Sequence, residues 1–472
     1  MMRACALTAA LLLACHLAPA PATAQPADAL DFVPPEIPGD AETARADWRE
    51  ALRVSVENAT SLDRYRHNLV VPVPANSPNS PDTANRTSLD VRGGWNLGRE
   101  IRASVSDRLN LSFQNDADTV SSRTLRNDLR EAFVTWAPTP GTYVDMGRIN
   151  VRNGVAMGFN PVDFLRAHTL VDQASQDPSV LRENRLGTVM ARVQWVGETG
   201  AASILLAPRL APETPIDDQQ HPAFNPEWGR TNGTTRMLLS ASLNQADDLS
   251  PQVLLYHDES ETRLGATLSH AVGEATVVYG EWAGGRGTNV SARARAYGAR
   301  TGSLDRLGAL AGLSQPDDGK SFYQDAVVGG SWTSTAKVTL NLEYIYHGAG
   351  LSRAEWHDWW KVGSLATQSL PVNELQWYDR AYAKSEQVPF TRHHAFARVA
   401  WTDAFIPRLE LSAFSLVNLY DGSLMGQVSA TYYWSDQWTT EILAGGTLGR
   451  DTSVYGSQSR TTNASFRLVR YF

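Results

Sequence analysis

The chain contains very little cysteine. Its two cysteines, Cys5 and Cys15, both lie in the first 24 residues, which have the pattern of a secretory signal peptide. Cleavage after Ala24 would leave no thiol, and this excludes a disulfide framework, a thiolate metal site and a cysteine nucleophile in the mature chain. A chain without thiols suits export into an oxidising compartment, where stray thiols would mispair.

The first 24 residues contain each part that a signal peptide needs. Arg3 supplies a positive charge, the apolar stretch Ala4–Ala18 is too short to span a bilayer, and Ala22–Ala24 supplies a small-residue cleavage site. The mature chain would then begin at Gln25. The alternative is a lipoprotein signal, because Leu12–Cys15 resembles a lipoprotein cleavage motif that would leave an acylated Cys15.

Lysine and long hydrophobic runs are also scarce. Only four of the 42 basic residues are lysines, and without Arg3 the mature chain carries 41 basic and 50 acidic residues. This negative balance argues against binding to nucleic acid or to anionic lipid in general. No mature segment supplies the roughly 18 consecutive apolar residues of a membrane helix. The mean hydropathy of −0.30 still allows a membrane barrel, because barrel strands alternate apolar and polar residues.

What the sequence has instead is long stretches of alternation. In Thr188–Val196, Lys337–His347 and Gln427–Trp434, apolar side chains occupy every second position. Alternation over about nine to eleven residues is typical of transmembrane barrel strands, whereas strands in soluble sheets are usually about five or six residues long. Tryptophans stand near the ends of such stretches, as an interfacial girdle would place them. These are Trp136, Trp195, Trp401, Trp434 and Trp438.

The connections between the alternating stretches fall into two classes. Short turns alternate with long connections, and counting strands places all the long connections on one side of the sheet. Outer-membrane barrels have this asymmetry, with short periplasmic turns and long extracellular loops. The long connections are Asn153–Asn184, Pro208–Thr234, Gly284–Lys320 and Ser352–Thr391. The sequence therefore predicts an all-β fold, a closed antiparallel transmembrane barrel of 16–18 strands.

Eighteen strands are expected, because an even number places both ends of the barrel on the same side. Seventeen alternating stretches lie between Ser88 and Phe472, and His67–Val73 is the candidate for one more. A Pro-rich spacer and a short amphipathic helix, from about Asp40 to Leu52, precede them. The expected organisation is a signal peptide over residues 1–24, a periplasmic tract over 25–63 and the barrel over 64–472. The tract is interpreted as a tether that could meet a periplasmic partner, with plugging of the lumen as the alternative.

The C-terminal run Asn463–Phe472 ends on an aromatic residue, with Ala464, Phe466 and Leu468 at alternate positions. It resembles the last strand of Gram-negative outer-membrane β-barrels, which the barrel insertion machinery reads. Arg470 departs from that pattern, because it stands on the apolar face. Together with the signal peptide and the large barrel, this run is similar to those of the porin-like channel family. The resemblance implies an outer-membrane location, contact with outer-membrane lipid and passage of a small solute.

No pattern in the sequence indicates catalysis, a metal site or a cofactor. His257–Glu259 and His357–Asp358 only loosely match the acidic pairs beside a histidine in protease barrels, and short runs of this kind arise by chance in polar loops. His393 and His394 are adjacent in a strand and point to opposite faces, so they are poorly placed to share a metal ion. We therefore expect no catalytic residues.

Strand parity predicts which polar side chains face the lumen. The expected pore-lining residues are Arg148, Asn150, Arg152, Arg192, Gln194, Lys337, Glu343, Arg398, Glu441 and Arg467. Two interpretations are open. These residues form either a salt-bridged ladder that stiffens the wall, or a selectivity surface whose arginines attract anionic or hydroxyl-rich solutes.

The connection that begins at Asn153 contains an apolar run, Gly158–Arg166, which would be unusual in a freely solvated loop. We expect this connection to fold into the lumen as a constriction. Two guanidiniums beside a low-dielectric wall would repel, so Arg148 and Arg192 need acidic partners. The acids of the connection are expected to supply them. They are Asp163, Asp172 and Glu183.

The sequence supports two functions. The first is an outer-membrane channel for passive or substrate-selective passage of small solutes, with selectivity set by the inward charges and the inward loop. The alternative is a component for export or assembly of an envelope polymer such as a polysaccharide. Neither involves nucleic acid. Single-channel conductance would discriminate between them.

Overall fold

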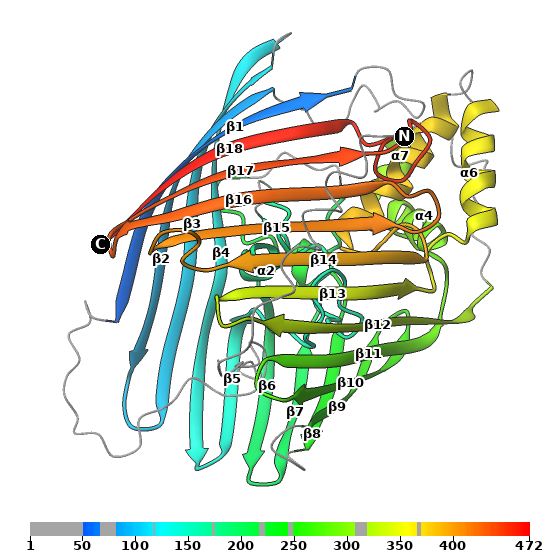
Figure 1. The fold of residues 1–472 in the computed structure, drawn as a ribbon. Helices are drawn as coiled ribbons and strands as arrows, with labels where there is room; N and C mark the ends of the chain where they lie inside the picture. Colours follow the sequence, from blue (N-terminus) through cyan, green and yellow to red (C-terminus); the bar gives the residue numbers. More distant parts are fainter. Residues whose placement is uncertain are drawn as a thin grey trace.

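A computed structural model of the chain describes residues 51–66, 82–116, 119–171, 175–216, 222–243, 249–306, 319–365 and 370–472. Across these residues the chain forms one sheet of 18 strands (Figure 1). Each strand pairs in antiparallel fashion with the next one along the chain, and the first strand also pairs with the last. The sheet is therefore closed into a barrel, and the predicted fold and strand number are confirmed.

The first nine strands are β1 (Leu52–Tyr65), β2 (Thr83–Asn96), β3 (Ile101–Asp116), β4 (Thr119–Thr139), β5 (Thr142–Ile149), β6 (Thr188–Gly197), β7 (Gly200–Ala207), β8 (Arg236–Leu243) and β9 (Leu249–Asp258). The other nine are β10 (Thr262–Val272), β11 (Thr276–Gly287), β12 (Ser321–Thr333), β13 (Val338–His347), β14 (His393–Trp401), β15 (Leu409–Asn418), β16 (Leu424–Ser435), β17 (Trp438–Leu448) and β18 (Arg460–Tyr471).

The helices of the described chain lie in the long connections. α2 (Pro178–Glu183) follows β5, α3 (Trp228–Thr231) follows β7, α4 (Val290–Thr301) and α5 (Ser303–Arg306) follow β11, and α6 (Arg353–Leu365) and α7 (Leu370–Ser385) follow β13. Each of these connections leaves an odd-numbered strand, so all lie at one end of the barrel, as predicted. In Figure 1, α4, α6 and α7 gather at the end opposite the C-terminus. No helix in the described ranges has the length and apolar character to cross a membrane.

The first strand begins earlier than the sequence indicated. β1 opens at Leu52, so the barrel starts there and not at residue 64, and Leu52 belongs to a strand and not to a helix. The strand was missed because its outward positions turn polar after Val56, at Asn58 and Thr60, which ends the apolar alternation. The remainder of the expected helix and the candidate strand His67–Val73 lie outside the described residues.

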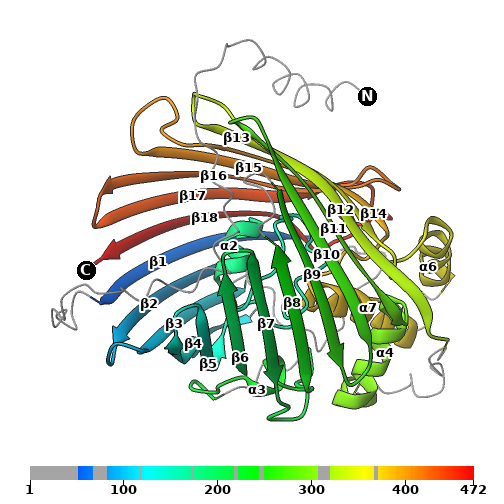
Figure 2. The ribbon, with the colours of Figure 1, turned by 90° about the horizontal axis from the view of Figure 1, so that it is seen from below.

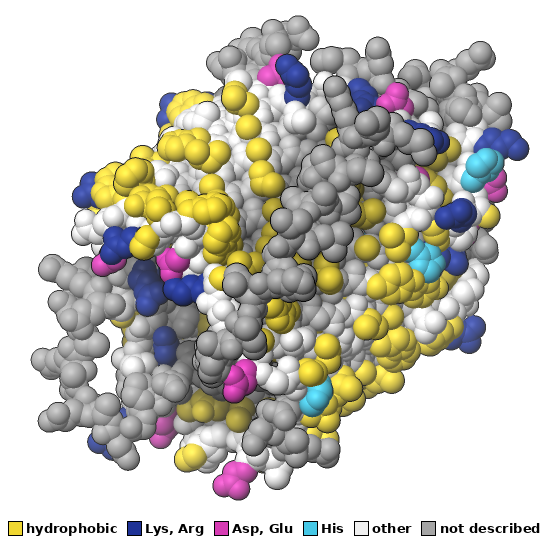
Figure 3. All heavy atoms as spheres, in the orientation of Figure 1, with side chains coloured by type: hydrophobic (Ala, Val, Ile, Leu, Met, Phe, Trp, Pro, Cys, Tyr) yellow, Lys and Arg dark blue, Asp and Glu magenta, His cyan; other side chains and the backbone are white. Residues whose placement is uncertain are grey.

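The outer face of the barrel is apolar. Alternate residues of the strands point outward, and Val328, Leu342, Val428 and Ile442, from four different strands, are each more than half exposed. In Figure 3 hydrophobic side chains spread over much of the visible wall. An apolar outer band around a closed antiparallel barrel is the architecture of the outer-membrane porin type, in which every backbone group is paired while side chains meet lipid.

Tryptophans mark the short-turn end of this band. Trp136, Trp195 and Trp434 stand at strand ends beside short turns and are 46%, 51% and 62% exposed. Trp438 is also exposed and opens β17. This arrangement matches the expected girdle, because indole rings favour the boundary between hydrocarbon and water.

Arg470 is accommodated at the same boundary. It lies on the outward face of β18, and its guanidinium carbon is 5.4 Å from the centre of the Trp438 ring and 4.6 Å from that of Phe472. Aromatic faces attract a cation while leaving it in contact with water. The departure from the apolar pattern therefore carries a charge at the membrane edge and not one buried in hydrocarbon.

Candidate functional site

The connection between β5 and β6, residues 150–187, folds into the barrel. Ala156 and Phe159 of this connection are buried against the inward side chains Tyr279, Ile345 and Phe396 of β11, β13 and β14. Further along, its residues Val162 and Leu165 join a second cluster with inward residues of β6 to β9. Figure 2 shows α2, which belongs to this connection, between the opposing walls. The predicted inward folding is therefore confirmed.

Two wall carboxylates hold this inward loop by its backbone. The amides of Val155 and Ala156 both donate to Oε1 of Glu281 on β11. The amides of Met157 and Gly158 donate to the two carboxylate oxygens of Glu343 on β13, at 2.6 and 2.9 Å.

Glu343 also accepts the Tyr279 hydroxyl at 2.7 Å and is only 4% exposed. The sequence correctly placed Glu343 inward, but the side chain anchors the loop and does not line open space. Together the two carboxyl groups fix four consecutive amides of the loop to the wall.

The α2 segment then crosses to the other side of the lumen. The amide of Gln176 donates to Gln427 Oε1 of β16 at 2.8 Å, and Asp177 pairs with Arg398 of β14 at 3.2 Å. At the far end of α2, Asn184 lies 3.4 Å from a guanidinium nitrogen of Arg130 on β4. The segment from 175 to 184 therefore bridges strands that lie far apart around the barrel.

A ladder of charges covers the wall formed by β17, β18 and β1 to β4. Glu57 of β1 is contacted by Arg108 at 2.6 Å, by Arg86 at 2.8 Å and by Arg467 at 3.5 Å. Arg467 also pairs with Glu441 of β17 at 2.6 Å. The side chains of Arg86 and Arg467 are 20% and 30% exposed although they point inward, so solvent reaches this wall from within the lumen.

The ladder of charges continues along the inner faces of β2 to β4. Asp128 binds Arg126 at 2.7 Å and accepts the amide of Asn110 at 2.7 Å, while Asp90 binds Arg130 at 2.6 Å. Arg467 and Glu441 were expected at this wall, but Glu57, Arg86 and Arg108 were not. They follow the same alternation, and their parity could have been found once β1 was recognised as a strand.

Arg192 and Gln194 face the lumen as expected, and their partner is Asp145 of the neighbouring strand β5. Asp145 accepts from Arg192 Nε at 2.9 Å and from Gln194 Nε2 at 2.8 Å. The hydroxyl of Thr135 also donates to Asp145 at 2.6 Å. The strand wall thus supplies the acid that Arg192 needs, and the predicted partnership with the loop acids is wrong for this residue.

Arg148 does not line the lumen. Strand parity places it on the same side of β5 as Met146, which is 63% exposed, whereas Ile149 is the buried inward residue. Its guanidinium donates to the carbonyl oxygens of Gly187, at 2.8 Å, and of Pro226 in the connection after β7. The parity prediction failed here because β5 ends in the lumen loop, and the alternation of Arg148 with Ile149 was read in the wrong phase.

Lys337, which was expected to line the pore, does not face the lumen either. It occupies the short turn before β13 with a left-handed backbone (φ 59°), is largely exposed and pairs with Asp403 of another short turn. Asn150 lies inside the barrel, where its backbone amide donates to a carboxylate oxygen of Glu131 at 3.0 Å. Arg152 is half-buried within the inward loop itself.

The acids of the inward loop have other partners than those expected. Asp163 is fully buried and pairs with Arg185 at the end of the same connection, at 2.5 Å. Glu183 is exposed on α2, and Asp172 lies outside the described residues. The acid that does reach an arginine of the wall is Asp177, through Arg398. Sequence proximity predicted the wrong partner for Asp163, because this acid pairs with Arg185 within its own connection.

Helices cover the end of the barrel with the long connections. Tyr297 of α4, Trp356 and Trp360 of α6, and Tyr378 and Tyr382 of α7 form one buried cluster. This helical cap meets the inward loop at His168, whose ring stacks on Tyr297 at 4.9 Å and pairs with Glu386 at 2.8 Å.

Glu386 follows α7, outside the strands. Burial alone would raise the pKa of Glu386, but His168, Arg293 and Arg166 lower it, and the net direction is downward. The cap and the inward loop are therefore joined through a charged carboxylate at neutral pH.

Among the described residues no group of three or more His, Cys, Asp or Glu side chains is arranged to hold a metal ion. His257 and Asp258 end strand β9, His357 and Asp358 lie exposed on α6, and His394 is buried against Thr391 and Tyr455. The chemistry that the interior offers is therefore ionic and hydrogen-bonding.

Comparison with known proteins gives structural likeness only. No family model and no curated protein sequence match the chain. Among solved structures, Acinetobacter baumannii OccAB4 is 8% identical with a TM-score of 0.48, over 89% of this chain and 97% of that one. Pseudomonas aeruginosa OpdK, solved with vanillate, is 8% identical with a TM-score of 0.48, over 89% and 98%. The porin of Rhodopseudomonas blastica, a triple mutant, is 8% identical with a TM-score of 0.39, over 89% and 99%. These likenesses are too remote to say what this chain binds.

Proposed function

We propose that the protein is an outer-membrane channel for small solutes, whose path runs between the α2 segment and the charged wall of β17, β18 and β1 to β4. The observation that carries this proposal is the partial exposure of Arg86 and Arg467 inside a closed barrel. A wall that only stiffened the barrel would have no reason to keep inward guanidiniums in solvent. On the wall of β11, β13 and β14, by contrast, Tyr279, Ile345 and Phe396 are buried against the inward loop.

The charges of this wall favour anionic solutes. Around Glu57 three arginines, Arg86, Arg108 and Arg467, meet two carboxylates, Glu57 and Glu441. The surplus guanidinium charge, in a narrow space with low-dielectric walls, raises the local concentration of anions. Arginine also offers paired donors that match a carboxylate or phosphate. The ladder and the selectivity surface are thus the same set of residues.

The inward loop argues against the alternative of polymer export. It is fastened at Glu281, Glu343, Gln427 and Arg398, on four different strands. A wide conduit for a polysaccharide would require these contacts to open together. We retain as proposals that the terminal strand is read by the insertion machinery and that the N-terminal tract meets a periplasmic partner.

The test is the ion selectivity of the purified barrel in a planar bilayer under a salt gradient. Replacing Arg86 and Arg467 with glutamine should shift the reversal potential toward cations and lower the anion-to-cation permeability ratio by about twofold or more. Arg470→Gln is the matched control, because that guanidinium lies on the outer face. An unchanged reversal potential in a folded Arg86→Gln, Arg467→Gln protein would contradict the proposal.

A further inference from the structure

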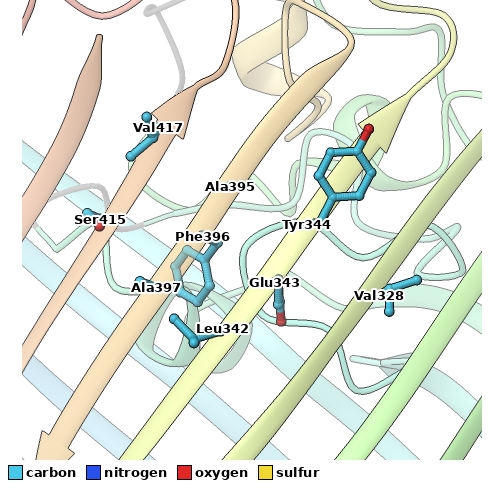
Figure 4. Close-up of a pocket in the computed structure, with 9 residues that line it drawn as sticks. All are labelled: Val328, Leu342, Glu343, Tyr344, Ala395, Phe396, Ala397, Ser415 and Val417. Atoms are coloured by element: carbon cyan, nitrogen blue, oxygen red, sulfur yellow. The ribbon is translucent and has the colours of Figure 1, made fainter. Parts of the chain in front are cut away.

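A groove lies on the outer face of the barrel over β12 to β15. Its floor is made of small side chains, Ala395, Ala397 and Ser415, and larger apolar residues form its sides. The groove has a volume of about 410 Å³. Figure 4 shows the residues that line it. Small outward residues on two neighbouring strands leave a depression between the flanking side chains of Val328, Leu342 and Val417.

One end of the groove continues into a polar cluster. Tyr344, which lines the groove, shares a hydrogen bond of 2.6 Å between its hydroxyl and Nδ1 of His393. The His393 ring lies 5.2 Å from that of Tyr346 and 5.5 Å from that of Tyr420. Arg353, at the start of α6, places its guanidinium 5.5 Å from the centre of the Tyr420 ring. The groove and the cluster therefore form one continuous surface.

The cluster carries more positive than negative charge. Arg392 donates to the Gly350 carbonyl at 3.0 Å and pairs with Glu355 at 3.2 Å. Arg353 has no acidic partner within the described part of the chain. Partial burial raises the pKa of Tyr420, and Arg392 and Arg353 act in the opposite direction. Both guanidiniums thus favour the ionised form of the Tyr420 hydroxyl, and Glu355 opposes them.

The position of this surface relative to the membrane selects the kind of ligand. The polar cluster lies where β13 ends and β14 begins, which is the end of the barrel with the long connections. His393 and Tyr344 point outward there, at the boundary of the apolar band, and the groove runs below them into the band. A ligand that fits both parts has a negatively charged head and an apolar tail.

We propose that this surface binds a phosphorylated acyl lipid of the outer leaflet, with an acyl chain in the groove and a phosphate between Arg353 and the His393–Tyr344 pair. Guanidinium, imidazole and phenol groups are donors for phosphate oxygens. The apolar floor excludes a free phosphate ion as the whole ligand, since half of the surface would stay unfilled. The proposal concerns the outer wall and does not depend on what passes through the lumen.

Native mass spectrometry of the detergent-solubilised barrel tests this proposal, with dioleoyl phosphatidic acid and dioleoyl phosphatidylcholine as probes. The parent protein should retain phosphatidic acid in preference to phosphatidylcholine. Arg353→Gln should weaken phosphatidic acid binding by about tenfold, as expected for loss of one charge-assisted contact. Arg123→Gln is the matched control, because Arg123 also lies over an exposed aromatic ring, Phe113, but far from the groove.

A larger side chain in the groove tests whether the groove binds the acyl chain. Ala395→Leu should weaken binding of phosphatidic acid, whereas Ala430→Leu, on the outer face of β16, should not. Equal retention of both lipids, or equal loss in Arg353→Gln and Arg123→Gln, would overturn the proposal. Displacement by inorganic phosphate without an effect of Ala395→Leu would assign the cluster to a soluble anion instead. A change of oligomeric state in Ala395→Leu would assign the groove to a second copy of the chain, and this too would overturn it.

Discussion

The inner faces of β11 to β15 and of β17, β18 and β1 to β4 alternate in the same way but present different groups to the lumen. On the first wall, Tyr279, Ile345 and Phe396 are buried under the inward loop. On the second wall, Arg86 and Arg467 keep part of their surface in solvent. The comparison teaches that one wall holds the inward loop, whereas the other keeps charged groups in solvent, where we propose that a solute passes.

The largest effect on conductance should come from removing the two carboxylates that hold the inward loop. Replacing both Glu281 and Glu343 with alanine takes away the acceptors of four consecutive loop amides and leaves these buried donors unpaired, at a cost of about 1–3 kcal/mol each. We expect the loop to leave the wall and single-channel conductance to rise with increased noise. Glu410→Ala is the control, because that inward carboxylate accepts a hydrogen bond from the exposed Tyr433 hydroxyl on β16 and, among the described residues, none from the loop. A double variant that folds and conducts like the parent protein would show that the loop is held by other contacts.

A smaller change of the same kind can be made at the loop itself. A methyl group on Gly158 would lie 2.6–2.9 Å from the Phe396 ring atoms, which is too close without movement. Gly158→Ala should therefore displace the loop from this wall at a cost of about 1–3 kcal/mol, and should raise conductance less than the double glutamate variant does. Gly280→Ala meets no atom closer than 3.9 Å and provides the comparison. Equal conductance in the two alanine variants would indicate that the Phe396 ring moves aside and leaves the loop in place.

The contact between the loop and Arg398 of β14 tests how charge inside the lumen affects selectivity. Asp177→Asn removes the carboxylate that pairs with this guanidinium. The freed charge of Arg398, on β14, adds to the positive charge inside the lumen, so anion preference in a salt gradient should increase modestly, and more so at low ionic strength. Asp403→Asn, which breaks the Lys337 pair outside the lumen, should leave selectivity unchanged. A shift of the same size in both variants would point to an effect of net charge alone.

The smallest effect concerns the helical cap. Burial raises the pKa of Asp379 on α7 to about 7, against the opposing influence of Arg295. Because the folded pKa lies above the unfolded value, the folded cap holds its proton more tightly, and its stability falls as pH rises from about 4 to about 7. Hydrogen exchange in α7 should accelerate between pH 5 and pH 8, after correction for intrinsic rates. Asp379→Asn should flatten this dependence, and an equally steep profile in the variant would assign it to another group.

The fold was largely predictable from the sequence, because alternation is a local signal that does not depend on distant partners. The outward faces of β6, β13 and β16 were assigned correctly from it. The signal failed where lipid-facing positions carry polar residues, at Asn58 and Thr60 of β1. These two side chains form hydrogen bonds with Asn85 and Thr87 of β2, and such pairing lets them stand on the outer wall.

The candidate site was predictable only in part. Inward folding of the loop could be read from its apolar run, since those side chains need a buried surface. The partners of its charges could not be read, because they depend on register and closure. Glu57 and Arg467 meet only because the first strand pairs with the last. Likewise, sequence proximity suggested Asp163 for Arg192, whereas the adjacent strand provides Asp145.

The fastening of the inward loop through main-chain amides has a consequence for how the passage could be retuned. At positions 155 and 157, which are only half-buried, the anchor uses groups that almost every amino acid carries, so the side chains there can change without removing it. Proline, which has no amide hydrogen, would break the anchor at either position. Selection could therefore alter the bore or the polarity of the opening by single substitutions in the loop, while the two carboxylates in the wall stay in place.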